Sequence, residues 1–285
     1  MANSEEPTPK KRKGFVFTPI VKPERRTQTP RFDQLVFEEA PVAPMPDKVV
    51  ELLGAQDLFI GIDVETHQLA PRNRSRGIVG RFGHWSADLG DGYEELRVVQ
   101  VGWCCGRFGG GQPTVKQRLV KPDGFAIDPA ATAKHGISHA RALAEGCQLA
   151  DVMAEFLHDL TNASKEGGRL VAHNLTFDGE LVSLEMQRCG MDEGRETLHR
   201  LLREGVCTMS PAICHWVREM TGEQNVPFYA RMGLKQLVQA LLPSRRKMLE
   251  RHHEAGNDAE MHWLVCRDLW ERARRQQPAA SEPCG

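Results

Sequence analysis

The chain has 285 residues, and its 37 Lys and Arg against 38 Asp and Glu give a formal net charge of −1. With 40% hydrophobic and 26% charged residues, the composition is that of a globular protein of one large or two small domains. The near-neutral net charge argues against a polycation that coats nucleic acid through net charge alone. It does not rule out local basic patches. Because there is no apolar run of about 18 residues and no signal-peptide core, we expect a soluble intracellular protein without membrane contacts.

The two ends of the chain read as tails. Residues 1–46 are rich in proline and basic side chains without a lasting apolar period, and residues 277–285 are similarly polar. The structured domain is therefore predicted over residues 47–276. Residues 10–13 (Lys-Lys-Arg-Lys) resemble a nuclear localisation signal, with a phosphate-contacting arm or a solvated segment as competing interpretations. We expect the protein in the nucleus or the cytoplasm, and apolar residues of the first tail also suggest a protein partner.

Inside the domain, strand-like and helix-like apolar patterns alternate. The predicted strands are residues 58–64, 96–105, 117–120 and 169–172. The predicted helices are residues 149–160, 181–190, 233–242 and 254–274. Such an order predicts an α/β domain built on a mixed sheet.

The first predicted strand ends with two carboxylates, Asp63 and Glu65. Side chains at positions i and i+2 of a strand share a face, about 7 Å apart, and two carboxylates there repel each other unless a cation lies between them. Val64 is expected to point the other way, into the core. The alternative is that Asp63 only helps to start a turn and that Glu65 is solvated.

A second acidic position follows the short strand at 169–172. The segment His-Asn-Leu-Thr-Phe-Asp at residues 173–178 leads from that strand into a helix, which places Asp178 in the first turns near the end of the sheet. The alternative is structural: Asn174 or Thr176 caps the helix and Asp178 complements the helix dipole.

A third position precedes the last predicted helix. His253 and Asp258 are separated by a turn of small residues that lets the imidazole fold back beside the carboxylate. A histidine next to a carboxylate suits a general base beside a metal ligand, although a lone histidine is more often structural. His252 is adjacent and shows how readily a histidine occurs.

Taken together, the three positions supply a consistent chemistry. Asp63, Glu65, Asp178 and Asp258 are the hard oxygen ligands that two Mg²⁺ or Mn²⁺ ions prefer. Two such ions about 3.5–4 Å apart stabilise the attacking and leaving oxygens of phosphodiester cleavage. His253 has an intrinsic pKa near 6.5 and is suited to accept the proton of the attacking water.

The ordered motifs Asp-x-Glu-Thr, His-Asn-x-x-Phe-Asp and His-x-Ala-x-x-Asp-Ala resemble the DnaQ-like, DEDDh class of 3′→5′ exonucleases over about residues 57–275. The resemblance implies a ribonuclease H-like fold with a five-stranded mixed sheet flanked by helices. It implies release of nucleoside 5′-monophosphates from 3′ ends of single-stranded DNA or RNA. The four carboxylates would bind the metals, and His253 would be the general base. The implied substrate contacts are Thr66, His67, Asn174 and His135.

Residues 67–95 form an insertion between Thr66 and the second predicted strand, where compact members of the class have a short loop. It contains Arg72, Arg74, Arg76 and Arg81. The insertion is either a basic flap in which Phe82 or Trp85 stacks on a base, or a solvated surface loop. The chain as a whole has two alternative functions. It could be an exonuclease fold that has lost catalysis and only binds nucleic acid or protein, or an assembly subunit recruited through its N-terminal tail, with nuclease activity secondary.

Overall fold

The computed structural model describes residues 44–70, 78–79, 84–86, 92–223, 225, 227 and 231–276, all within the unit Phe37–Gly285. The basic segment 10–13, the tail 277–285 and the four arginines of the insertion lie outside the described residues. Within the described part, no helix is both long and apolar enough to cross a membrane.

Five strands form one mixed sheet in the order β5-β4-β1-β6-β7. β1 (Leu58–Thr66) is central: it pairs antiparallel with β4 (Val98–Arg107) and parallel with β6 (Arg169–Ala172). β5 (Thr114–Leu119) extends the antiparallel side, and β7 (Val206–Cys207) extends the parallel side. The predicted strand at 117–120 was wrong in its bounds, because Val120 leaves β5 and forms a bridge with Cys147.

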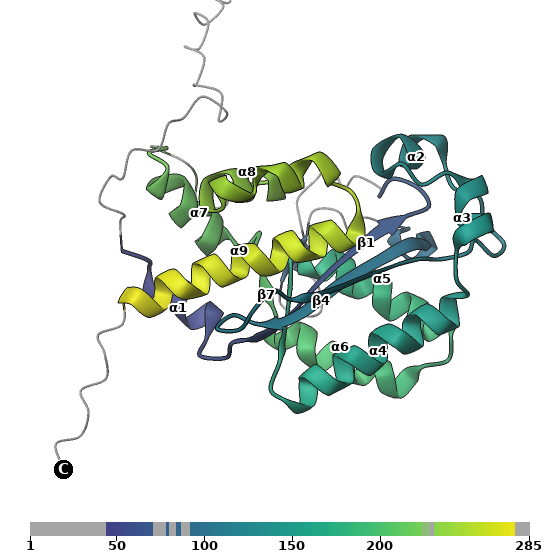
Figure 1. The fold of residues 1–285 in the computed structure, drawn as a ribbon, viewed down its shortest axis with the longest axis horizontal. Coiled ribbons are helices and arrows are strands. Elements are labelled where there is room, and N and C mark those ends of the chain that lie inside the picture. The colour runs from purple at the N-terminus through teal and green to yellow at the C-terminus, as the bar shows by residue number, and fades with distance from the viewer. Residues whose placement is uncertain are drawn as a thin grey trace, which may run out of the picture. The chain divides into compact units, whose positions relative to one another are not determined.

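Helices cover both faces of this sheet (Figure 1). α4 (Leu149–Lys165), α5 (Leu175–Arg188) and α6 (Asp192–Glu204) pack on one face. α9 (Ala255–Gln276) crosses the other face, over β1 and β4. The structure thereby confirms the expected five-stranded mixed sheet flanked by helices.

Several described elements are too short to show a clear period in the sequence. The remaining helices are α1 (Asp47–Leu53), α2 (Pro129–His135), α3 (His139–Glu145), α7 (Pro211–Met220) and α8 (Leu234–Leu241), with 3₁₀ turns η2 (Tyr93–Glu95) and η3 (Pro243–Arg251). Among the described helices, α4, α5, α8 and α9 correspond to the four helices predicted from the sequence, whereas α6 was not predicted.

The side chains of β1 alternate between the two faces. Ile60 and Ile62 belong to the apolar core with α4, α5 and α6. Gly61 lies under α9, where a methyl group would overlap the backbone oxygen of Ala259. Gly102 of β4 is equally close to the start of α9. The two glycines therefore let this helix rest directly on the backbone of the sheet.

The described part of the insertion holds a short hairpin. β2 (Ile78–Val79) pairs antiparallel with β3 (Trp85–Ser86). His84 fixes it to the helical face: Nε2 lies 2.7 Å from the carbonyl oxygen of Leu202, and Thr176 Oγ1 donates to the carbonyl of His84 at 3.0 Å. This part of the insertion is anchored to α5 and α6, whereas Phe82 and the four arginines lie outside the described residues.

Candidate active site

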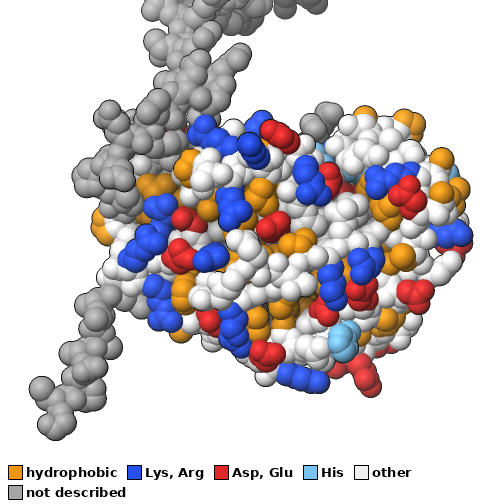
Figure 2. Space-filling model, in the orientation of Figure 1, with side chains coloured by type: hydrophobic (Ala, Val, Ile, Leu, Met, Phe, Trp, Pro, Cys, Tyr) orange, Lys and Arg blue, Asp and Glu red, His pale blue; other side chains and the backbone are white. Residues whose placement is uncertain are grey.

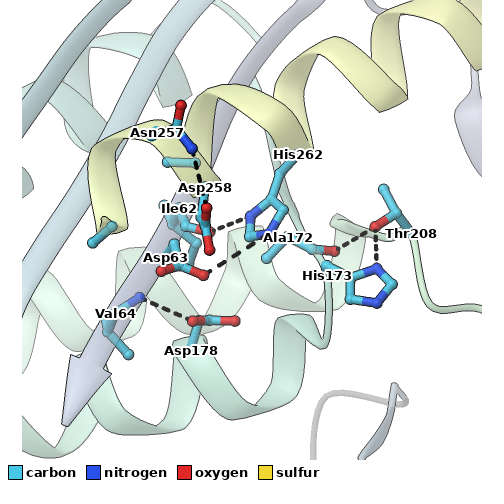
Figure 3. A network of polar contacts seen from close by, with 12 residues as sticks. Ile62, Asp63, Val64, Ala172, His173, Asp178, Thr208, Asn257, Asp258 and His262 are labelled. Atoms are coloured by element: carbon cyan, nitrogen blue, oxygen red, sulfur yellow. Dashed lines mark hydrogen bonds and ion pairs between the residues drawn. The ribbon is translucent and has the colours of Figure 1, made fainter. Parts of the chain in front are cut away.

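Three carboxylates meet where β1 ends beneath the first turn of α9, and Figure 3 shows two of them, Asp63 and Asp258. Oxygen atoms of Asp63, Glu65 and Asp258 all lie within 4.8 Å of one another. Glu65 and Asp258 are buried, and Val64 between the first two points into the core, as predicted. The i, i+2 spacing places Asp63 and Glu65 on one face of the strand. The fold then brings Asp258, 193 positions after Glu65, next to both of them.

Two glutamines of the sheet hold the start of α9 over these carboxylates. Gln100 Oε1 accepts from the backbone N–H of Ala255 at 2.9 Å, and Gln117 Oε1 accepts from that of Gly256 at 2.7 Å. The first N–H groups of a helix have no partner within it. These side chains supply the missing acceptors and fix the position of Asp258.

The fourth carboxylate, Asp178, comes from the first turn of α5. Its Oδ1 accepts from the backbone N–H of Val64 at 3.1 Å, and the residue is buried (Figure 3). Asn174 precedes the helix at φ 85° and ψ 48° and makes no capping hydrogen bond with its side chain. Thr176 donates to the insertion instead. The capping alternative for this segment was therefore wrong.

The negative charges of the clustered carboxylates repel one another. Burial raises the pKa of Asp63 well above its ordinary value, and the charges of Asp178, Asp258 and Glu65 raise it further. A divalent cation between these oxygens would offset the repulsion, and carboxylates are the donors that Mg²⁺ and Mn²⁺ prefer. The residues present therefore fit the expected metals.

Both neighbouring histidines reach the site. His253 Nδ1 lies 3.7 Å from Glu65 Oε1, while His252 Nδ1 lies 2.8 Å from Asp258 Oδ2. Their rings stack with centroids 3.9 Å apart. His253 has a φ of 74°, and its backbone N–H donates to Asp258 Oδ2 at 3.1 Å. Spacing alone indicated His253, but the structure places His252 in the closer contact with a carboxylate.

A cavity of about 790 Å³ opens onto the carboxylates, within the range of about 300–1,000 Å³ typical of ligand sites. Thr66, Asn174 and His135 line it, as expected for substrate contacts. His67 is not among its lining residues. The His67 Nδ1 accepts from the N–H of Arg97 at 3.0 Å, and its ring contacts Phe125 edge-on, so this side chain is held elsewhere.

His135 is fixed beside the end of β1. Its Nδ1 accepts from the N–H of Ile137 at 3.1 Å, so Nε2 carries the proton and points at the carbonyl of Thr66, 3.2 Å away. Burial lowers the pKa of His135, which favours this neutral form. The histidine thus orients the backbone at the end of β1.

The cavity lining also includes three ionisable residues that no sequence motif indicated: Lys134, Arg231 and His262. Lys134 and Arg231 bring positive charge to an otherwise acidic site. His262 is fully buried in α9, and burial lowers its pKa to about 4. Four residues after Asp258 on a helix, it shares that residue's face, which was a usable sequence signal.

No family model matches the chain, and no curated protein matches its sequence. Solved structures do match in fold. Exonuclease I aligns with 17% identity and a TM-score of 0.51, over 77% of this chain and 42% of that chain. E. coli exonuclease I in complex with a dT13 oligonucleotide aligns with 16% identity and a TM-score of 0.51, over 77% and 42%. A product-bound exonuclease I gives 16% and 0.50, over 78% and 45%.

These matches cover less than half of the exonuclease I chains. At such identities they concern the arrangement of helices and strands and not the chemistry. The chain described here has the ribonuclease H-like α/β fold of exonuclease I.

Proposed function

We propose that the protein is a metal-dependent 3′→5′ exonuclease of the DnaQ-like, DEDDh class that acts on single-stranded DNA or RNA. The observation that carries the proposal is the convergence of Asp63, Glu65 and Asp258 within 4.8 Å in a cavity that His252 and His253 also line. The fold supports it, since a neighbour of the same fold was solved with a single-stranded oligonucleotide.

In this proposal, Asp63, Glu65 and Asp258 would hold one divalent cation, and Asp178 would contribute to holding a second. When bound, Mg²⁺ or Mn²⁺ supplies an activated water and stabilises the charge on the scissile phosphate. Asp178 is kept in position by the N–H of Val64, and Asp258 by the N–H of His253.

His253 accepts the proton of the attacking water. No described contact within hydrogen-bonding distance ties up its ring, because Nδ1 lies 3.7 Å from Glu65. His252 instead contacts Asp258 directly and acts as a positioning residue. The different contacts of the two rings support this division of labour.

The 3′-terminal nucleotide occupies the cavity in this proposal. Thr66 and Asn174 line it, and Lys134 and Arg231 offset the negative charge that repels a phosphate backbone. The reaction releases nucleoside 5′-monophosphates. The 2′-hydroxyl distinguishes RNA from DNA through local pocket shape, so the same assay on both polymers decides between them.

The test is digestion of oligonucleotides labelled at the 5′ or the 3′ end, both DNA and RNA, with Mg²⁺, Mn²⁺ or EDTA. We expect a ladder that shortens from the 3′ end and disappears with EDTA or with Asp63→Ala. His253→Ala should abolish the ladder, whereas His252→Ala should only reduce it. Equal digestion by wild type and Asp63→Ala would contradict the proposal. Tight binding without hydrolysis would favour the inactive binding module instead.

A further inference from the structure

His262 has an unused nitrogen that faces the carboxylates. Its Nδ1 lies 2.8 Å from the carbonyl oxygen of Ile62, and because a carbonyl only accepts, Nδ1 carries the proton. The lone pair of a neutral ring is therefore on Nε2. The nearest described polar atom recorded for Nε2 is Asp63 Oδ1 at 3.9 Å, too far for a hydrogen bond (Figure 3).

One cation can span that separation. With metal–nitrogen distances of about 2.0–2.1 Å and metal–oxygen distances of about 2.0–2.2 Å, the two donors lie roughly 3–4.3 Å apart across the usual angles. The 3.9 Å between Nε2 and Asp63 Oδ1 falls in this interval. His262 also lines the cavity, although only 1% of the residue is exposed.

The other ring nitrogen is bonded as in most metal-binding histidines. Such residues almost always donate their second N–H to a carboxylate or a backbone carbonyl, which fixes both the tautomer and the ring orientation. Here the carbonyl belongs to Ile62, the residue before Asp63 on β1. The strand that supplies the carboxylate therefore also orients the imidazole.

We propose that His262 Nε2 is a nitrogen ligand of the cation held by Asp63, so that the site takes Mn²⁺ or another borderline transition-metal ion in preference to Mg²⁺. This inference rests on the proposed metal site. An all-carboxylate site suits both Mg²⁺ and Mn²⁺, whereas an added imidazole ligand favours first-row transition-metal ions over Mg²⁺. The selectivity follows from one residue that replaces an oxygen donor by a nitrogen donor.

The proposal is tested by pulsed electron paramagnetic resonance of the full chain loaded with Mn²⁺ alone. Wild type should show coupling of the bound ion to an imidazole nitrogen. Because His252 and His253 also lie near Asp258, the control is the double variant His252→Gln/His253→Gln, which should keep the coupling. His262→Gln should lose it, and His262→Asn, which retains a side-chain N–H, serves as the second variant.

Calorimetric titrations with Mn²⁺ and Mg²⁺ provide the independent readout. His262→Gln should weaken Mn²⁺ binding at least about tenfold and Mg²⁺ binding much less. A purely structural role would weaken both ions equally and would overturn the inference. So would nitrogen coupling that survives in both His262 variants, or wild type that binds Mn²⁺ without any coupling. If Asp63→Asn binds Mn²⁺ as tightly as wild type, the proposed metal site itself is wrong.

Discussion

The two faces of β1 differ in what they demand of their residues. Toward α4, α5 and α6 the strand presents Ile60, Ile62 and Val64, which fill an apolar core. Toward α9 it presents Phe59, Gly61 and Asp63. Phe59 stacks on Phe108 with ring centroids 4.4 Å apart, but beyond it the helix rests on backbone rather than on side chains.

The first face is therefore stabilised by the packing of large apolar side chains. The second is stabilised by direct contact between the helix backbone and the glycines of the sheet. A core of branched side chains loses stability in proportion to the methyl groups removed. A glycine contact fails when one methyl group is added, because backbone atoms have no rotamer to change. The proposed activity depends on the second face in particular, since Asp258 is brought over Asp63 and Glu65 only if α9 stays in place.

The largest effect should follow Asp63→Asn, which removes the central carboxylate of the α9 face. Nuclease activity should fall at least about 10³-fold, because transition-state charge stabilisation of several kcal/mol is lost. Without metal the variant should nevertheless be more stable than wild type at neutral pH. The raised pKa of Asp63 means that the folded state binds more protons than the unfolded one, so wild-type stability falls as pH rises above 3.8.

Denaturant unfolding in EDTA at several pH values measures this difference. The stability gain of Asp63→Asn should grow as pH rises. A variant less stable than wild type at neutral pH would show that the carboxylate cluster carries no repulsion.

Gly102→Ala should have the next largest effect. Its methyl group would overlap the backbone of Ala255 and Gly256, which should lower the free energy of unfolding by about 1–3 kcal/mol. Activity should fall about 10²-fold if Asp258 moves by about 1 Å. Gly109→Ala is the matched control, because a methyl group there meets no atom within 4 Å. Equal behaviour of the two variants would refute the close-approach argument.

Gln100→Leu tests the polar support of the same helix. The substitution makes a buried position more apolar, yet it leaves the N–H of Ala255 without its acceptor. We expect a loss of about 1–3 kcal/mol of unfolding free energy and reduced activity. Arg118→Ala, which breaks a half-exposed ion pair with Glu155, should cost about 0–1 kcal/mol. We predict that urea unfolding will show a larger loss of unfolding free energy for Gln100→Leu than for Arg118→Ala.

Ile60→Val probes the opposite face. Removing one methyl group from the apolar core should cost about 0.5–1.5 kcal/mol. α5 on this face carries Asp178, but the N–H of Val64 holds that carboxylate, so the rate per folded molecule should stay at the wild-type level. A thermal melt and an activity assay normalised to folded protein separate the two quantities, and a large loss of rate would mean that the faces are coupled.

The smallest effect at neutral pH is expected for His173→Gln. Burial lowers the pKa of His173 from 6.5 to about 3, so between these values the unfolded state binds more protons. Wild-type stability should therefore fall as pH decreases below 6.5, and the slope should be shallower in the variant. The dependence has the opposite sign to that of Asp63. Unfolding curves from pH 4 to 7 check it, and parallel slopes would contradict it.

Much of the fold was accessible from the sequence because its longest elements have clear periods. α4 and α9 repeat apolar residues over many turns, and β1 begins with an unbroken apolar run over residues 58–62. α1, α2 and α3 have seven residues each, too few for a period to emerge. α6 was missed because most of its 13 residues are polar, with few buried.

The carboxylates of the site were predictable because each sits at the end of an element in a recognisable motif. Their supports were not. Gln100 and Gly102 act on α9 through contacts more than 150 positions away in the chain, and no local pattern distinguishes them from other strand residues. His252 and His253 are neighbours with the same side chain. Spacing favoured His253, but their different contacts with Asp258 and Glu65 could only be seen in the structure.

The two ends of the described domain lie next to each other. The backbone N–H of Met45 donates to Gln276 Oε1 at 2.7 Å, and Met45 is buried although it precedes α1. A short peptide joining these ends, with new termini at the exposed turn of Gly109–Gly111, would give a circular permutant with the same neighbours in space. In that chain the His253–Asp258 segment would come before Asp63. The order of the motifs along the chain therefore reflects how the elements are connected, whereas the site requires only their arrangement in space.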